Sequence, residues 1–209
     1  MINMRVFFIS LLMAACVSVT AQSRLSAAET KAFVSRITSE SKNIKTLQAD
    51  FIQTKKMDFL SKDLISSGKI AMQTPNLLSW RYSKPYLYNV VFKNNKIYID
   101  NQGKKSAVDA KSKYFEKINK LIVGSATGNL FNDPEFNVSY LKSGGYTIAR
   151  FVPKSAQLSK YIKTVELYFA KDQSTVSKVN LTEASGDSSQ IVFKNTQVNA
   201  KLPAAAFSL

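Results

Sequence analysis

The 209-residue chain contains no histidine and only one cysteine, Cys16. Because histidine is the usual partner of a nucleophilic serine or cysteine, its absence excludes Ser–His and Cys–His catalytic pairs and histidine-rich metal sites. Cys16 lies in an N-terminal segment that we expect to be removed, which would leave no thiol for a disulfide, a zinc site or thiol catalysis. The GxxxxGK[ST], GxGxxG and GxSxG motifs are also absent. We therefore expect no catalytic residues, no cofactor and no metal.

Acidic residues are few: 14 Asp and Glu stand against 29 Lys and Arg, for a net charge of +15. Two carboxylates would suffice for a glycosidase-like pair, so a carboxylate-based envelope hydrolase remains an alternative. Most of these acids, however, fall at turns or at polar positions of alternating runs, which favours solvated surface. The positive charge predicts acidic partners such as anionic lipid surfaces or acidic proteins, with a solvated lysine-rich surface as the alternative.

The first 21 residues have the layout of a secretory signal peptide. Arg5 provides the positive start, residues 6–17 (VFFISLLMAACV) form an apolar run, and Val19 and Ala21 are the small residues before a cleavage site. The run is shorter than the ~20 residues that span a bilayer. We expect an exported, soluble domain at residues 22–209, which would rarely meet nucleic acid. In the alternative, residues 13–16 (MAAC) form a lipobox, and a lipidated Cys16 anchors the protein to a membrane.

A helical period follows the signal peptide. Ser26 and Glu29 have the spacing of a capping box. The apolar residues after them recur at helical spacing and predict an amphipathic helix over residues 27–45. These residues are Phe33, Val34, Ile37, Ile44 and Leu47.

From residue 48 onward the apolar residues alternate in short runs, separated by turns such as those at 94–95, 144–145 and 185–187. This pattern predicts an antiparallel sheet of about ten or eleven strands. Residues 112–128 return to a helical period and predict a second helix lying across the sheet. No internal repeat or linker interrupts the chain. We therefore expect one α+β domain that is mostly β.

Bulky aromatic residues occupy alternating strand positions, and they outnumber what one face of a sheet needs. They allow two interpretations, which the pattern alone does not separate: a packed core, or an incompletely filled half-barrel with an apolar cavity for a lipid. These residues are Phe51, Trp80, Tyr82, Tyr88 and Phe92.

Residues 47–56 (LQADFIQTKK) and 67–85 (SGKIAMQTPNLLSWRYSKP) resemble the periplasmic outer-membrane lipoprotein carrier proteins, the LolA-like family. The family pattern is F-x-Q, then a glycine with alternating apolar residues, then Pro-Asn, an apolar residue, a tryptophan and a nearby proline. Later segments, including residues 136–140 and 165–169, follow in a similar order, so the resemblance covers essentially residues 22–209. The matching positions are Phe51, Gln53, Gly68, Ile70, Met72, Pro75, Asn76, Leu77, Trp80 and Pro85.

The resemblance implies an unclosed, curved antiparallel half-barrel whose concave face is covered by helices acting as a lid. It also implies a monomeric periplasmic carrier of a Gram-negative envelope, with lipoproteins as cargo, an inner-membrane exporter as donor and an outer-membrane receptor or membrane as acceptor. If Cys16 is lipidated, a membrane-anchored lipoprotein acceptor of similar fold is the alternative. The residues expected to line the acyl cavity are Phe51, Ile70, Met72, Leu78, Trp80, Tyr82, Val90 and Phe92, with Phe115, Ile118 and Ile122 from the second helix.

Two positions depart from the family. Its well-known members have an arginine before the motif proline that is thought to hold the lid closed, whereas this chain has Thr74. A hydroxyl lacks the fork of donors of a guanidinium, so we expect lid control at Thr74 to differ. The printed chain ends at Leu209, just after Phe207, where relatives carry a further segment. We expect receptor docking or cargo retention to differ accordingly.

Overall fold

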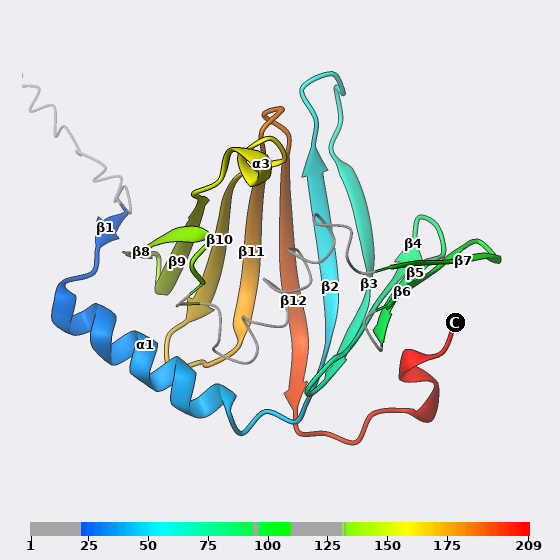
Figure 1. Cartoon of the computed structure of the whole chain (residues 1–209), viewed down its shortest axis with the longest axis horizontal. Helices are drawn as coiled ribbons and strands as arrows, with labels where there is room; N and C mark the ends of the chain where they lie inside the picture. The colour runs from blue at the N-terminus through cyan, green and yellow to red at the C-terminus, as the bar shows by residue number, and fades with distance from the viewer. Residues whose placement is uncertain (1–21, 94–95, 110–130, 132) are drawn as a thin grey trace, which may run out of the picture.

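The computed structural model describes residues 22–93, 96–109, 131 and 133–209, and its main element is one 12-stranded sheet (Figure 1). The strand order is β1-β8-β9-β10-β11-β12-β2-β3-β4-β5-β6-β7, and every neighbouring pair is antiparallel. Because β1 and β7 lie at opposite edges, the sheet is unclosed. The predicted fold class is confirmed, with a slightly higher strand count than expected.

The strands follow the chain mostly as hairpins, with β1 and α1 placed before the first long pair. The two strands that the sequence did not predict are β1, which has only two residues, and β7, whose sequence KKSAVD is largely polar. The elements are β1 (Ser23–Arg24), α1 (Ala27–Ser41), β2 (Thr46–Lys56), β3 (Leu64–Gln73), β4 (Leu77–Lys84), β5 (Tyr88–Lys93), β6 (Lys96–Asn101), β7 (Lys104–Asp109), β8 (Phe136–Ser143), β9 (Tyr146–Pro153), α3 (Ala156–Ser159), β10 (Ile162–Ala170), β11 (Val176–Glu183), β12 (Ser188–Val198) and the 3-10 helix η1 (Ala204–Phe207).

The predicted capping box starts α1. The Ser26 hydroxyl accepts a hydrogen bond from the Glu29 backbone N–H, and the Glu29 carboxylate accepts one from the Ser26 N–H. Lys142 of β8 donates a 2.8 Å hydrogen bond to the same carboxylate. This bond and those from Ser26 lower the pKa of Glu29 to about 2. The N-terminus of α1 is thereby tied to the edge of the sheet.

The helix ends at Ser41, so the predicted end at residue 45 was wrong. The backbone N–H groups of Asn43 and Ile44 donate to the carbonyls of Glu40 and Ser41, and this turn leads the chain into β2. Ile44 and Leu47 therefore do not extend the apolar stripe of α1. Their apolar spacing continued past the end of the helix because both still face the core.

One face of the sheet carries α1, and we call it the inner face. Phe33 and Ile37 of α1 pack there in a first cluster with strand residues such as Phe151 and Phe169. A second cluster covers the same face over β2–β6 and β12. Cross-strand neighbours Val179 and Ile191 lie at the border of the two clusters, so the apolar inner face is continuous.

The structure explains why residue 68 of β3 is a glycine. A Cβ at this position would lie 1.8 Å from the Arg81 carbonyl oxygen of β4, because the two backbones approach closely at a register shift. Gly68 is also the cross-strand neighbour of both Phe51 and Tyr82. The rings of Phe51 and Tyr82 meet across it, with centroids 5.0 Å apart. The absent side chain thus lets two aromatic rings join the second cluster.

Several predictions concern residues outside the described part of the chain: the signal peptide at 1–21, the turn at 94–95 and the helix at 112–128 with Phe115, Ile118 and Ile122. Among the described residues, no helix has the length and apolar character needed to cross a membrane.

Candidate functional site

The second inner-face cluster brings together all eight predicted cavity residues that lie in the described part of the chain. They come from β2, β3, β4 and β5, where alternate side chains point to one face and antiparallel pairing sets them side by side. Ile70 of β3, for example, is paired with Trp80 of β4, which is paired with Val90 of β5. The eight are Phe51, Ile70, Met72, Leu78, Trp80, Val90 and Phe92, all buried, and the partly buried Tyr82.

Aromatic rings form the centre of this cluster. The ring centroids of Phe51 and Trp80 are 4.9 Å apart, and Phe193 of β12 meets Trp80 edge-on at 6.1 Å. The Tyr82 hydroxyl donates a 2.7 Å hydrogen bond to Gln53. Burial, with a smaller contribution from nearby Tyr86, raises the pKa of Tyr82 to about 12. Tyr82 therefore stays neutral at physiological pH and adds no charge to the apolar face.

Among the described residues, the indole N–H of Trp80 is a buried polar group of this cluster without a hydrogen-bond acceptor. Its Nε1 is buried, and no acceptor within the described residues lies in hydrogen-bonding geometry with it. The Trp80 side chain lowers the pKa of Tyr82 and so offsets part of the rise, but its N–H does not meet the geometry of a hydrogen bond to that hydroxyl. A buried N–H without an acceptor costs about 1–3 kcal/mol. An acceptor brought by a ligand would recover this cost.

Sequence reasoning left out part of the cluster. Most of the residues missing from the predicted set lie on neighbouring strands and point to the same face as the predicted residues. The others lie just after α1, where the sequence predicted a longer helix. Cross-strand register, once known, would have added them, because directly paired residues share a face. They are Ile44, Leu47, Ala49, Tyr88, Ile97, Ile99, Ile191 and Phe193.

The helix α1 covers the other half of the inner face, over β8–β11, and not the predicted cavity residues themselves. It reaches the second cluster through the connection that follows it, residues 42–45. In Figure 1, α1 runs below the sheet toward the start of β2, and this connection joins the two.

Thr74 contacts this connection and not the helix. Its hydroxyl donates to the Lys45 carbonyl over 3.3 Å, and its backbone N–H donates to the same oxygen over 2.9 Å. From the other side, Asn199 accepts from the Lys45 N–H at 2.7 Å and donates to the Asn43 carbonyl at 3.0 Å. Neutral groups from the residue after β3 and from the segment after β12 thus hold the link between α1 and the sheet.

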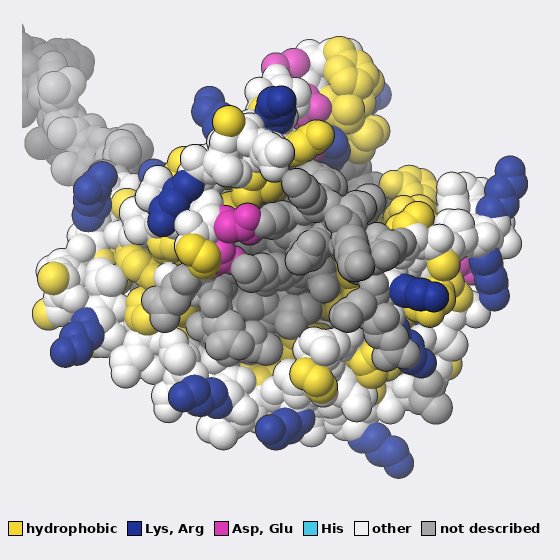
Figure 2. Space-filling view, in the orientation of Figure 1, with side chains coloured by type: hydrophobic (Ala, Val, Ile, Leu, Met, Phe, Trp, Pro, Cys, Tyr) yellow, Lys and Arg dark blue, Asp and Glu magenta, His cyan; other side chains and the backbone are white. Residues whose placement is uncertain are grey.

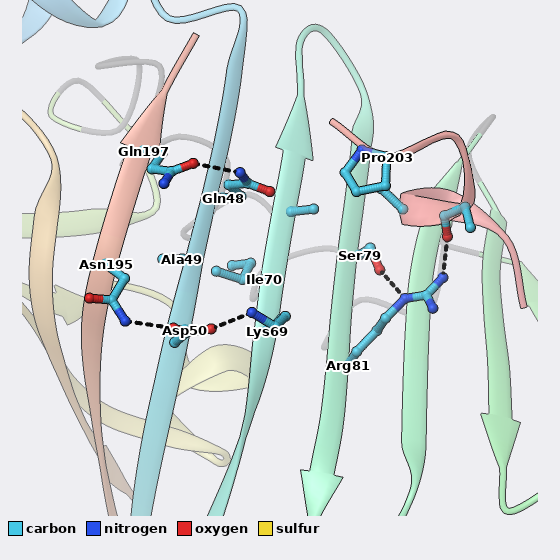
Figure 3. A pocket seen from close by; sticks show the side chains of 13 residues that line it. Gln48, Ala49, Asp50, Lys69, Ile70, Ser79, Arg81, Asn195, Gln197 and Pro203 are labelled. Atoms are coloured by element: carbon cyan, nitrogen blue, oxygen red, sulfur yellow. Dashed lines mark hydrogen bonds and ion pairs between the residues drawn. The ribbon is translucent and has the colours of Figure 1, made fainter. Parts of the chain in front are cut away.

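The outer face has a pocket of a different character, shown in Figure 3. It measures about 360 Å³ and lies between β12, β2, β3, β4 and the C-terminal segment. Its polar side chains bond to each other: Asp50 accepts from Lys69 at 2.8 Å and from Asn195 at 2.7 Å. Arg81 donates to the carbonyls of Ala205, at 2.6 Å, and Ser208. These contacts fasten the C-terminal segment to the sheet, and they suit this pocket poorly to an apolar ligand.

The inner face is therefore the better candidate site. Its described residues form a broad apolar surface, and one buried indole N–H among them has no acceptor there. The cluster members from the described part of the chain are aliphatic or aromatic.

The chain was compared with known protein families, curated proteins and solved structures. A family model described as outer membrane lipoprotein carrier protein LolA matches residues 42–209. An outer-membrane lipoprotein carrier protein of Chromobacterium violaceum is 27% identical over 191 residues, covering 87% of this chain and 81% of that protein. One from Dechloromonas aromatica is 29% identical over 169 residues, covering 79% and 77%.

Among solved structures, the MucA/MucB complex of Pseudomonas aeruginosa is similar with a TM-score of 0.51 and 11% identity. The match covers 85% of this chain and 60% of that one. At this identity the likeness concerns the fold alone.

Proposed function

This chain belongs to the LolA family of outer membrane lipoprotein carrier proteins, and we propose that its inner face binds the acyl chains of lipoproteins. In this proposal the protein is exported to the periplasm of a Gram-negative cell. It takes lipoproteins from an inner-membrane exporter and delivers them to a receptor or to the membrane on the outer side. The observation that carries the proposal is the joining of eight predicted residues in one apolar cluster next to an unmatched indole N–H.

The energetics of such a carrier are favourable. Removing an acyl chain of about fifteen methylenes from water is worth on the order of 10 kcal/mol, at ~0.8 kcal/mol each. A lipoprotein would not cross an aqueous compartment without such a container. Hand-over requires that the net binding free energy be smaller than this value. The free-energy cost of opening the inner face would reduce it.

We infer that α1, which covers the inner face over β8–β11, and its connection at residues 42–45, which reaches the second cluster, together form the movable cover. The cluster residues are packed against each other, so an acyl chain must displace existing contacts to enter. The bonds from Thr74 and Asn199 to this connection are neutral hydrogen bonds, worth about 0.5–1.5 kcal/mol each. Such bonds would let the cover open without breaking a buried ion pair.

Thr74→Arg should slow cargo release by about tenfold or more. A guanidinium at this position could bond several carbonyls of residues 42–45, and each charge-assisted bond is worth about 1.5–3 kcal/mol. The measurement is the rate at which a fluorescent acyl ligand leaves the loaded protein in the presence of acceptor vesicles. Thr74→Lys is the matched control, because it adds the charge without the fork of donors. If Thr74→Arg releases cargo at the original rate, the cover is controlled elsewhere, for example by residues 112–128.

The proposed function predicts that lipidated proteins accompany the carrier. We would express the full chain in a Gram-negative host, isolate it from the periplasmic fraction without detergent, and analyse it by native mass spectrometry. Bound proteins bearing acyl chains are the expected result. A periplasmic protein that carries no acylated protein, even when the exporter is present, would contradict the proposal.

The same spectra determine the N-terminus of the processed chain. A chain that begins at Gln22 supports a periplasmic carrier. A chain that begins at an acylated Cys16 would instead support the membrane-anchored acceptor of similar fold.

A further inference from the structure

The hairpin of β2 and β3 projects beyond the rest of the sheet. The β12–β2 pairing ends at Ser188–Lys56 and the β3–β4 pairing at Ser67–Lys84, while residues 57–63 continue past both. Figure 1 shows this hairpin rising at the top of the molecule, at the end of the sheet opposite α1. Its side chains are apolar and exposed: Phe59 is 75% exposed, Ile65 63%, Leu64 51% and Leu60 39%.

Neighbouring segments extend this apolar surface along the same edge. Because adjacent strands are antiparallel, the β4–β5 turn with Tyr86 and Leu87 lies at the hairpin end of the sheet, and both side chains are exposed. Tyr161 is also exposed there, and its carbonyl accepts from Ala184 of the β11–β12 turn. We call residues 57–65, 86–87 and 161 the hairpin edge. It holds seven of the eleven exposed large hydrophobic side chains in the described part of the chain.

Lysines surround these apolar side chains. The segments 55–65, 84–87, 154–163 and 183–187 contain seven lysines and four acidic residues. Two of these acids are paired with lysines of the same segments, Glu183 with Lys55 and Asp63 with Lys56. Figure 2 shows apolar side chains gathered at the top projection, with Lys and Arg distributed around it. The edge and the segments that flank it therefore combine exposed apolar groups with a net charge of +3.

We propose that the hairpin edge is a docking surface for an anionic phospholipid membrane, with Phe59 and Leu60 entering the headgroup region. Aromatic and aliphatic side chains flanked by lysines are what an anionic bilayer interface attracts, because apolar burial and charge attraction act together. A projecting hairpin with four exposed apolar side chains can enter a fluid lipid surface, which needs no shaped groove to receive it. If no partner covered them, four exposed apolar side chains on one hairpin would favour aggregation.

The position of the edge also relates it to the proposed cargo site. Tyr86 of the β4–β5 turn stacks on Tyr82 of the inner-face cluster, with ring centroids 6.4 Å apart. An acyl chain that left the inner face past Tyr82 would emerge at the docked lipid. This relation rests on the proposed function, whereas membrane docking by the hairpin edge does not depend on it.

The test compares vesicle binding of two double variants. Phe59→Ser/Leu60→Ser should weaken binding to vesicles of phosphatidylethanolamine and phosphatidylglycerol by about tenfold or more, because interfacial binding scales with apolar area. The matched control is Val108→Ser/Val198→Ser, which removes two apolar side chains of 40% and 46% exposure away from the edge. The control should bind as the unchanged protein does, and circular dichroism verifies that both variants are folded. Acyl binding, measured without vesicles, should be the same in all three proteins.

A depth measurement gives an independent result. Residues 22–209 contain no cysteine, so Phe59→Cys and Val198→Cys each accept one environment-sensitive dye. Brominated lipids should quench the dye at position 59 and leave the dye at 198 unaffected. The proposal is overturned if the unchanged protein does not bind these vesicles, which would assign the edge to a protein partner, or if Phe59→Ser/Leu60→Ser binds them equally well. Loss of acyl binding in Leu78→Glu with vesicle binding retained would separate the two proposals.

Discussion

Leu78→Glu is expected to abolish acyl-chain binding. Leu78 is 1% exposed and lies between its cross-strand neighbours Met72 and Phe92 in the inner-face cluster. A carboxylate there would be unpaired in an apolar site, which costs several kcal/mol if it stays ionised. Neutralisation would raise its pKa and still leave a polar group against the acyl chain. The measurement is saturation binding of a fluorescent long-chain fatty acid, followed by transfer of a lipoprotein to acceptor vesicles.

Two further variants make this result decisive. Gln73→Glu adds the same side chain on the outer parity of β3, where Gln73 is exposed, so acyl binding should be unchanged. Phe193→Glu changes a partly buried member of the cluster, where the charge keeps contact with water, and it should weaken binding without unfolding the protein. If Gln73→Glu loses acyl binding while a folded Leu78→Glu keeps it, the inner and outer faces have been assigned the wrong way round.

The sequence could place these residues on one face of the sheet because strand alternation leaves only two choices. Once Ile70, Trp80 and Val90 are placed on one side, antiparallel pairing sets them next to each other in the folded sheet. The end of α1 was harder, because Ile44 faces the core from a turn and so continues an apparent helical stripe. The polar strand β7 carried no alternation from which it could be recognised.

Contacts between segments that are far apart in the chain could not be predicted from the sequence. From the sequence, Arg81 is only a polar residue of a predicted strand. In the structure it donates a hydrogen bond to the carbonyl of Ala205, which lies 124 positions later in the chain. Asn199 clamps the connection after α1 in the same way, through the backbone of Asn43 and Lys45. Such contacts depend on the path of the C-terminal segment over the sheet, and backbone carbonyls leave no mark in a sequence. The projection of the β2–β3 hairpin beyond β12 and β4 likewise followed only from the strand register.

The only tryptophan of the chain gives the second large effect. Trp80 is 7% exposed, so its emission should already lie at short wavelength before ligand binds, and a spectral shift alone would say little. A long-chain fatty acid with a nitroxide on its tail quenches by contact, so it should quench Trp80 strongly and saturably if the chain lies on the inner face. Each methylene removed from the ligand should weaken binding by ~0.8 kcal/mol, or about fourfold in the dissociation constant.

A displaced tryptophan provides the control for this experiment. In Trp80→Phe/Gln73→Trp the indole moves to an exposed position of outer parity, and the same ligand should bind but leave the emission almost unchanged. Trp80→Phe also removes the indole N–H that lacks an acceptor. If that group bonds the ligand carbonyl, this variant should bind an acyl ester more weakly while its affinity for an alkane of equal length stays the same. Equal quenching of both proteins, or no dependence on chain length, would place the ligand elsewhere than on this apolar cluster.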